Sequence, residues 1–290
     1  MTKQFAPEYQ RTKEGWVIFP SDQQYRKEIF PPEVNSHPAK ANTFLVQSII
    51  EYVSEPGETL MDVMAGTGTI MVGALVGRDI ICIEISEKFH QLQVRALERL
   101  EELAPGVSDH ISLVNMPCQK YQPIPNLADH IIFSPQYANI IKKSANYRET
   151  DRLTVEKQSS YDFSEYSKSP LNLGTMSEFL WSKEMKKVYN KCYQTIKVGG
   201  TMTLILKDHI EAGERVAMTQ MAVDDCAEIG FRLQSWEKWK APGMAYTRIR
   251  RARGEVTVED EDIVVFSKES GEWKSTYTQQ ESLMVKALSE

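Results

Sequence analysis

A glycine turn and a glutamate that follows it could together bind a nucleotide-like ligand. Gly66-Thr67-Gly68 stands between an apolar, strand-like run and a second apolar segment, and glycine lets the backbone approach a ligand closely. Glu84 ends the next apolar run, 18 residues after Gly66. A carboxylate at this spacing can accept hydrogen bonds from both hydroxyls of a ribose. The pattern therefore predicts a site for a ribose-bearing ligand, and an ordinary turn with a surface glutamate is the alternative.

The turn differs from two phosphate-binding motifs. No Lys-Ser or Lys-Thr pair follows the glycines, which excludes a P-loop, and Gly73 comes too late for the dinucleotide fingerprint. A ligand that has a ribose and lacks a pyrophosphate fits these residues better.

A second candidate for chemistry is the segment Ser134-Pro135-Gln136-Tyr137, which follows an apolar run that begins at Asp129. It offers a hydroxyl, a constrained backbone, an amide and an aromatic ring side by side. On its own it could also be a plain loop after a buried strand.

The elements that must position these residues follow from hydrophobic periodicity. Residues 1–36 are polar and aromatic and predict an irregular arm. The pattern then predicts helices at 42–53, 70–75, 89–103, 177–197 and 215–229, and strands at 59–63, 80–85, 111–114, 129–134, 201–206, 231–239 and 262–267. Gly199-Gly200 is expected to stop the helix that precedes it. Strands that alternate with helices indicate an α/β domain, with a mainly parallel sheet, helices on both faces and ligands at the carboxyl ends of the strands.

Six motifs in fixed order resemble the amino-type DNA methyltransferase family, over roughly residues 36–268. They are Ser36-His37-Pro38-Ala39-Lys40, Asp62-Val63-Met64-Ala65-Gly66-Thr67-Gly68-Thr69, Ile83-Glu84-Ile85, Asp129 to Tyr137, Lys197-Val198-Gly199-Gly200-Thr201 and Glu261 to Phe266. The resemblance implies a class I methyltransferase (Rossmann-like) fold, with a mostly parallel seven-stranded sheet and helices on both faces. It also implies methylation of cytosine N4 or adenine N6 with S-adenosylmethionine.

The resemblance assigns a set of residues to the cofactor. Asp62 and the turn would face its methionine part, Glu84 its ribose and Ile85 its adenine, and the segment from His37 to Lys40 would close the pocket. The implied cofactor-binding residues are His37, Pro38, Lys40, Asp62, Ala65, Gly66, Thr67, Gly68, Thr69, Glu84 and Ile85. No metal is implied.

The resemblance also implies catalytic roles for Ser134, Pro135, Gln136 and Tyr137. A base in duplex DNA must leave the stack before its amine can be reached, and Tyr137 would stack on it. The Ser134 hydroxyl and the Pro135 carbonyl would accept hydrogen bonds from the amine and aim its lone pair. Catalysis would then consist mostly of alignment for an in-line methyl transfer.

The sequence departs from the family pattern at two places. Gln136 stands where the family has a second proline, so the loop is less rigid and a side-chain amide faces the base. The segment from Val114 to Cys118 lacks the aspartate often found near the cofactor adenine. If Gln136 spoils the site, the chain is a methylase-like module that binds DNA or cofactor without catalysis.

Pro117-Cys118-Gln119 resembles the nucleophile motif of cytosine-C5 methyltransferases, in which a thiolate attacks C6 of the base. The usual glycines before the motif and a Glu-Asn-Val segment after it are absent from this sequence. An ordinary thiol at the end of a strand is therefore the favoured interpretation, and the C5 reaction is an alternative.

Two segments are candidates for contacts with nucleic acid. Residues 138–175 show no periodicity. They contain basic side chains, Lys142 and Lys143 among them, nearly as many acidic ones, and tyrosines that could stack on bases, which suits an extruded strand. Residues 236–254 contain six basic residues and one acidic residue. The candidates there for phosphate binding are Arg248, Arg250, Arg251 and Arg253. Solvated charged loops are the alternative for both segments.

Composition bounds the remaining interpretation. The 290 residues carry a net charge of −6, which argues against a protein that coats nucleic acid nonspecifically but allows a local basic surface. The four cysteines are far apart, which disfavours a zinc site or a disulfide framework. No apolar run is long enough to cross a membrane and the N-terminus lacks a signal-peptide core, so we expect a cytoplasmic protein of a prokaryotic, archaeal or viral host cell.

The sequence thus predicts three regions: an arm (1–36), a methyltransferase domain (37–270) and a tail (271–290). The resemblance implies methylation of a flipped base in double-stranded DNA, at cytosine N4 because a catalytic motif that opens with serine is commoner among the cytosine enzymes of the family. Adenine N6 is the second candidate, RNA stays open as a substrate, and a cognate restriction endonuclease is a candidate partner in a restriction-modification system.

Overall fold

The computed structural model describes residues 3–36, 40–138, 169–211, 213–241 and 245–270. The strands are β1 (Thr59–Asp62), β2 (Asp79–Glu84), β3 (Ile111–Asn115), β4 (Ala128–Phe133), β5 (Ile196–Leu206), β6 (His209–Glu211), β7 (Glu214–Val216), β8 (Arg232–Lys240) and β9 (Asp260–Ser267). The α-helices are α1 (Gln23–Ile29), α2 (Thr43–Val53), α3 (Glu87–Leu103), α5 (Glu178–Thr195), α6 (Met218–Ile229) and α7 (Ala245–Ala252). Shorter 3-10 helices are η1 (Pro32–Ser36), η2 (Thr69–Val76), η3 (Val107–His110) and η5 (Leu173–Thr175).

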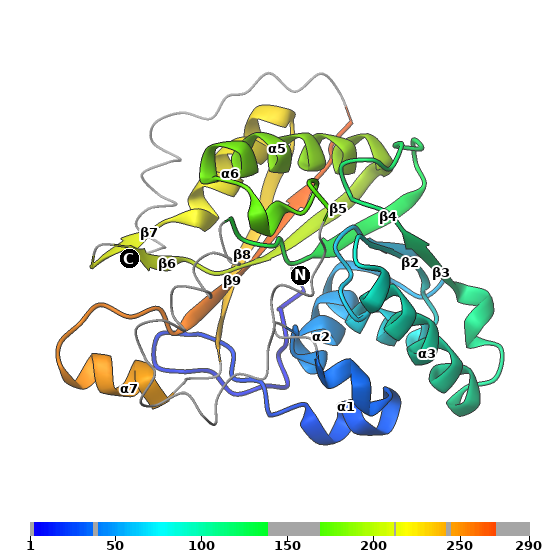
Figure 1. Cartoon of the computed structure of the whole chain (residues 1–290), viewed down its shortest axis with the longest axis horizontal. Coiled ribbons are helices and arrows are strands. Elements are labelled where there is room, and N and C mark those ends of the chain that lie inside the picture. The colour runs from blue at the N-terminus through cyan, green and yellow to red at the C-terminus, as the bar shows by residue number, and fades with distance from the viewer. Residues whose placement is uncertain (1–2, 37–39, 139–168, 212, 242–244, 271–290) are drawn as a thin grey trace.

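Seven strands form one sheet in the order β3-β2-β1-β4-β5-β9-β8 (Figure 1). The strands from β3 to β5 pair in parallel, and β9 is antiparallel to both of its neighbours. The strand order reverses between β1 and β4, and their carboxyl ends open there side by side. Open α/β sheets bind ligands at such a switch point.

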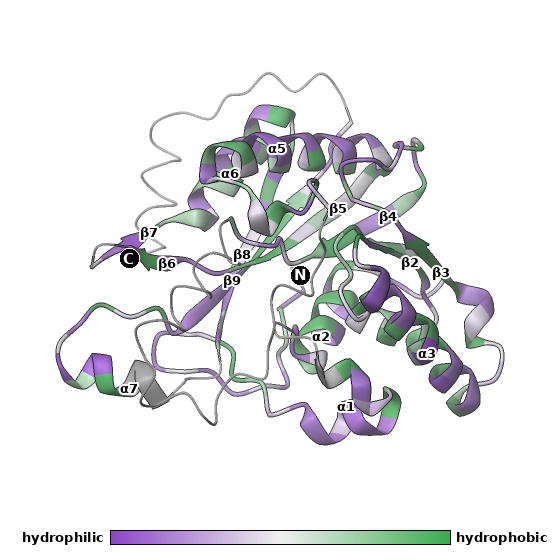
Figure 2. Ribbon diagram, viewed as in Figure 1, coloured by the Kyte–Doolittle hydropathy of each residue, from purple (hydrophilic) through white to green (hydrophobic). Residues whose placement is uncertain are grey.

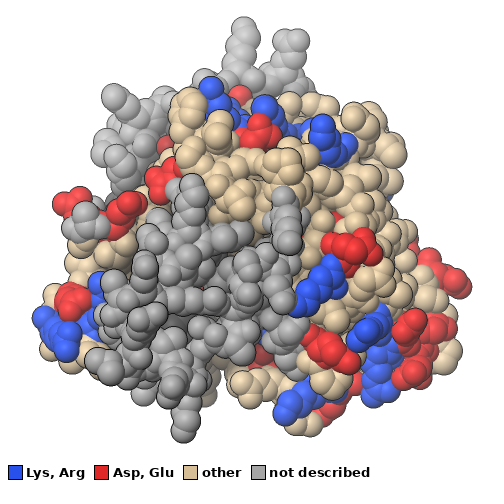
Figure 3. All heavy atoms as spheres, in the orientation of Figure 1, with Lys and Arg blue, Asp and Glu red and all other residues tan. Residues whose placement is uncertain are grey.

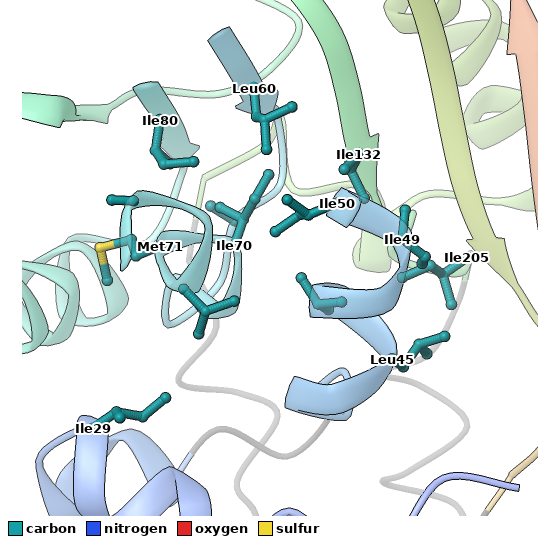
Figure 4. Packing of buried hydrophobic residues seen from close by; sticks show 14 of the residues in the cluster. Ile29, Leu45, Ile49, Ile50, Leu60, Ile70, Met71, Ile80, Ile132 and Ile205 are labelled. Atoms are coloured by element: carbon teal, nitrogen blue, oxygen red, sulfur yellow. The ribbon is translucent and has the colours of Figure 1, made fainter. Parts of the chain in front are cut away.

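The sheet separates two hydrophobic clusters. Successive residues of a strand point to opposite faces, so Leu60 belongs to one cluster and Met61 to the other. Helices α1, α2 and α3 lie on one face and α5 and α6 on the other (Figure 1). Figure 4 shows side chains of α1, α2 and η2 meeting those of β1, β2, β4 and β5 in the first cluster. Figure 2 shows the apolar colouring gathered on the central strands.

Helix α2 forms where the sequence predicts it. The Asn42 side chain accepts hydrogen bonds from the amides of Phe44 and Leu45, which satisfies donors that a helix start leaves free. Its apolar stripe is buried against the sheet, and the chain is extended again at Ser54. None of the helices in the described part of the chain has the length and apolarity that a membrane crossing requires.

The structure corrects the prediction that residues 1–36 are irregular. This segment contains α1 and η1, and its apolar side chains, among them Phe5, Val17 and Phe30, belong to the same cluster as those of α2. Val17 also forms a β-bridge with Trp239 at the edge of the sheet. The arm is therefore packed as part of the domain.

The prediction that Gly199-Gly200 stops a helix is also wrong. The helix ends at Thr195, and β5 begins at once and runs through both glycines. A Cβ at Gly200 would lie 2.1 Å from the carbonyl oxygen of Asp129. Glycine is needed at position 200 because β4 and β5 approach each other closely there.

Downstream, the helix predicted at 215–229 begins at Met218, because the preceding residues form the β6–β7 hairpin. Within the segment 236–254, the end of β8 is followed by helix α7, which the sequence analysis did not predict.

Candidate functional site

The glycine turn connects β1 to η2 in a conformation that requires glycine. Gly66 has φ 53° and Gly68 has φ 81°, both in the left-handed region. A Cβ at Gly68 would also lie 2.5 Å from the Cε atom of Met71. From α3, Gln93 donates through Nε2 to the Gly66 carbonyl at 2.7 Å. The hydrogen bond from Gln93 thereby fixes the glycine turn against α3.

Glu84 contacts this turn directly. One carboxylate oxygen accepts the Gly66 amide at 2.8 Å and the other accepts the Ser86 amide at 2.7 Å. The side chain is buried, and burial raises the pKa of its carboxyl to about 7. Its place at the end of β2 follows from the strand running in register with β1.

Asp62, the last residue of β1, adds a second carboxyl to the same place. It accepts the Met64 amide at 2.8 Å. Loss of hydration raises the pKa of Asp62 to about 8, and the charge of Glu84 adds to this rise. Because the pKa values of both carboxyls are raised, the two do not ionise readily side by side. A cationic group of a ligand would stabilise their ionised forms.

The Ser134–Tyr137 segment leaves the carboxyl end of β4, next to β1. Ser134 is exposed and Pro135 is buried. The indole nitrogen of Trp181 donates to the Gln136 carbonyl at 2.5 Å, and the Lys207 amide donates to the Tyr137 hydroxyl at 2.5 Å. Burial, and secondly the charge of Glu261, raises the pKa of Tyr137. The segment is thus held by Trp181 of α5 and by Lys207, the residue that follows β5.

One pocket joins the two predicted halves of the site. The predicted residues that line it are Lys40, Asp62, Ala65, Gly66, Thr67, Thr69, Glu84, Ile85, Ser134, Pro135, Gln136 and Tyr137. Gly68 shapes the turn but is not part of the lining. Burial and the nearby Arg26 lower the pKa of Lys40. His37, Pro38, Lys142 and Lys143 lie outside the described residues.

The pocket also has walls that the sequence analysis missed. Leu171 and Leu173 line it, and the Leu171 carbonyl accepts the side-chain amide of Gln119 at 2.8 Å. They lie in a segment without periodicity, so no pattern pointed to them. Trp181 lies in the helix predicted at 177–197, and its indole nitrogen is a polar group that needs a hydrogen-bond partner when it is buried.

Cys118 lines the same pocket but is poorly suited to act as a nucleophile. Burial, with the charge of Glu84 second, raises the pKa of its thiol to about 12. The reactive form of a cysteine is the thiolate, which is scarce at neutral pH for such a thiol.

The arginines of the basic segment are partly engaged with acids that follow them in the chain. Arg250 lies 2.7 Å from Glu255, and Arg251 contacts both carboxylate oxygens of Glu259. Arg253 is exposed, and the Arg248 side chain lies outside the described part. On the face of the molecule drawn in Figure 3, basic and acidic side chains are interspersed.

One group of side chains in the described residues has ligand atoms close enough to hold a metal ion. Glu178, His209 and Glu211 bring them within 4.8 Å of one another at the molecular surface. The absence of a metal therefore stays a prediction.

Comparisons with known proteins agree with the fold, and a family match covers the first part of the chain. A model of the DNA methylase family, which covers N6 and N4 methyltransferases, matches residues 2–95. The matched part includes the glycine turn and Glu84 and ends before Ser134. No curated protein matches the chain.

Solved structures share the architecture at low sequence identity. The [4+2]-cyclase SpnF is 13% identical with a TM-score of 0.50, over 84% of this chain and 88% of its own. The glycopeptide N-methyltransferase MtfA with bound S-adenosylmethionine is 13% identical with a TM-score of 0.48, over 80% and 89%. TrmN from Thermus thermophilus is 14% identical with a TM-score of 0.44, over 80% of this chain, which spans half of the length of TrmN.

The strand order and the likeness to SpnF show that the chain has the class I methyltransferase fold. The resemblance to the amino-type DNA methyltransferase family is confirmed over residues 2–95. Because SpnF is a cyclase, this fold does not define a reaction by itself, and the target must be argued from the site.

Proposed function

We propose that the protein methylates the exocyclic amine of a base flipped out of double-stranded DNA, cytosine N4 first and adenine N6 second. The observation that carries this proposal is the single pocket lined by the glycine turn and Glu84 on one side and by Ser134 to Tyr137 on the other. The family match supports DNA as the substrate. Serine at the start of the catalytic motif favours cytosine.

The residues present fit S-adenosylmethionine. Asp62 and the turn would hold the methionine part, Glu84 the ribose and Ile85 the adenine. The cofactor supplies an electrophilic methyl carbon on a sulfonium ion. Asp62 and Glu84 have raised pKa values, and the positive charge of this ligand would favour their ionised forms.

The chain's own residues would then orient the amine. The Ser134 hydroxyl and the Pro135 carbonyl accept its hydrogens, so that its lone pair points at the methyl carbon. The Tyr137 ring contacts the face of the base and keeps it out of the stack. The bound cofactor would supply the methyl group, and the amine that accepts it would lose one proton to solvent, which reaches the exposed Ser134.

The DNA itself would be contacted outside the pocket. We assign phosphate contacts to Arg248, Arg250, Arg251 and Arg253 of the 236–254 segment, and contacts with the extruded strand to the insertion at 138–175 with Lys142 and Lys143. A cognate restriction endonuclease and a cytoplasmic location complete the proposal.

The test is methyl transfer from labelled S-adenosylmethionine to mixed-sequence DNA, digested to nucleosides and analysed by mass spectrometry. N4-methylcytosine is the expected product, and N6-methyladenine would move the target to the second candidate. 5-Methylcytosine would move the chemistry to Cys118, and label only in a parallel RNA sample would change the substrate. Cofactor binding without transfer to either nucleic acid would leave a non-catalytic module.

A further inference from the structure

A buried arginine of the N-terminal arm touches the pocket wall from behind. Arg26 lies in α1, and only 2% of its surface is exposed. Its Nη1 atom donates to the Thr69 hydroxyl at 3.2 Å, and Nη2 donates to the Ala41 carbonyl at 2.6 Å. Thr69 and Ala41 both line the pocket. One guanidinium thus connects two parts of the wall that are 28 residues apart in the chain.

Asp22 holds this guanidinium in place and joins it to α2. Its Oδ2 atom accepts Arg26 Nε at 3.2 Å and Nη2 at 2.7 Å. The same oxygen accepts the Thr43 amide and the Thr43 hydroxyl, each at 2.8 Å. Although burial acts in the opposite direction, the Thr43 amide and Arg26 lower the pKa of Asp22. The Asp22 carboxylate therefore ties α1 to the first residue of α2.

We propose that Arg26 is a positioning residue for the cofactor: it fixes the segment before α2, which carries Lys40 and Ala41, relative to Thr69 at the end of the glycine turn. This inference rests on the proposed function, because it takes the pocket to bind S-adenosylmethionine. Arginine suits the task because its planar fork of donors reaches three acceptors in fixed directions, whereas a lysine ammonium is a flexible point charge.

The experiment compares Arg26→Lys with a matched control, Arg78→Lys. Arg78 is also a buried arginine, and it donates to the Ser54 hydroxyl and carbonyl and to the Val76 carbonyl, none of which lines the pocket. We would measure S-adenosylmethionine binding by calorimetry, turnover on DNA at saturating cofactor, and the melting temperature of each variant.

We expect Arg26→Lys to raise the Kd for S-adenosylmethionine about tenfold or more, the size of effect that removal of a supporting group behind a binding residue produces. Turnover at saturating cofactor should change by less than about threefold, because the catalytic loop does not touch Arg26. Arg78→Lys should lower the melting temperature and leave the Kd unchanged. Asp22→Asn keeps an acceptor oxygen and loses the charge, so it should also raise the Kd for S-adenosylmethionine. This variant replaces Arg26→Lys in the experiment if Arg26→Lys does not fold.

Two results would overturn the inference in distinguishable ways. If the wild-type protein binds S-adenosylmethionine and the Arg26 and Asp22 variants bind it equally well, the pair has only a structural role. If the wild-type protein does not bind S-adenosylmethionine at all, the proposed function fails and this inference fails with it.

Discussion

Glu84 is the residue at which the sequence and the structure agree most closely. Its spacing from Gly66 predicted a shared site, and its carboxylate accepts the Gly66 amide directly. We expect Glu84→Gln to raise the Kd for S-adenosylmethionine about tenfold or more, because the amide has one acceptor oxygen for two backbone donors and the ribose, and a donor left without a partner costs about 1–3 kcal/mol. Calorimetry would measure the change. A Kd equal to that of the wild type would remove Glu84 from the cofactor site.

The two carboxyls of the pocket predict how cofactor affinity depends on pH. The pKa of Glu84 is raised to about 7 and that of Asp62 to about 8, so both hold protons in the unliganded protein at lower pH. A cationic ligand favours the ionised forms, so affinity should rise as the pH increases through these values and level off above them. Calorimetry in buffers of different ionisation enthalpy should show that binding releases protons.

The same shifts fix the sign for stability. The folded state binds these protons more tightly than the unfolded chain does, so the unliganded protein loses stability as the pH rises from the ordinary carboxyl range through 8. Cofactor affinity that stays constant or falls as the pH rises from 7 to 8 would contradict the assignment of Asp62 and Glu84 to the cofactor site.

Tyr137 has a ring and a hydroxyl whose roles can be separated. We expect Tyr137→Ala to lower kcat about 100-fold, since the base loses the surface that aligns it, and to leave the Kd for the cofactor unchanged. Tyr137→Phe keeps the ring and removes only the hydrogen bond from the Lys207 amide, so its kcat should fall far less. Single-turnover methylation would measure both. Equal losses in the two variants would show that the hydroxyl matters and stacking does not.

Other residues of the site could not be found from spacing. Arg26 and Trp181 touch the pocket or its loop only because α1 and α5 pack there, and no local pattern records which carbonyl a buried donor will meet. Leu171 and Leu173 belong to a segment without periodicity. Gln136 is predicted to offer an amide to the base, and this stays a prediction: its side chain lines the pocket, and its Nε2 atom is buried without a hydrogen-bond partner among the described residues.

At the level of elements, α5 does more than cover the sheet. Through Trp181 it holds the carbonyl of Gln136, the residue that stands in place of the family's second proline. A hydrogen bond to the backbone thus provides a restraint that a proline ring would otherwise give.

We therefore expect Trp181→Phe to lower kcat about tenfold, because the loop loses that restraint and the amine is aimed less well. Cofactor affinity should not change. Met185→Leu, a conservative change at a buried position of the same helix, is the control and should have nearly wild-type kcat. A Trp181→Phe variant with normal kcat and only a lower melting temperature would limit the indole to packing.

The elements that sequence periodicity predicts well are those with one long buried face, such as α2, α3 and α5. The β6–β7 hairpin was missed because its strands are short and carry no buried alternation. The arm was judged irregular because α1 buries only Arg26 and Ile29, which gives no stripe. The glycine pair of β5 resembled a helix stop because the closeness of β4 is not visible in sequence.

For the whole molecule, the fold brings the cofactor and catalytic motifs together across the reversal of strand order between β1 and β4. Alternation of strands and helices predicted the parallel sheet, and it also pointed to the carboxyl end of the sheet, where the pocket lies. The surface proposed to face DNA is less determined by the sequence, because Arg250 and Arg251 form ion pairs with Glu255 and Glu259.

Replacing both arginines tests that surface. Arg250→Gln together with Arg251→Gln should weaken DNA binding and reduce the slope of log affinity against log salt, by at most about 0.9 for each phosphate that the variant no longer neutralises. Fluorescence anisotropy over a salt series would measure it. The matched control is Arg95→Gln with Arg99→Gln, two exposed, ion-paired arginines of α3. An equal effect of the two double variants would mean that α7 does not contact DNA.

The bridge between Val17 and β8 has a consequence for how the protein behaves among copies of itself. The Val17 amide donates to the Lys238 carbonyl at 2.9 Å, and the Lys240 amide donates to the Val17 carbonyl at 2.8 Å. These bonds occupy donors and acceptors on the outer edge of the sheet, where an uncovered strand would invite pairing with another chain. The arm thereby covers part of the β8 edge, so we expect a chain shortened past Val17 to leave backbone groups of Lys238 and Lys240 unpaired and to self-associate more than the whole chain does.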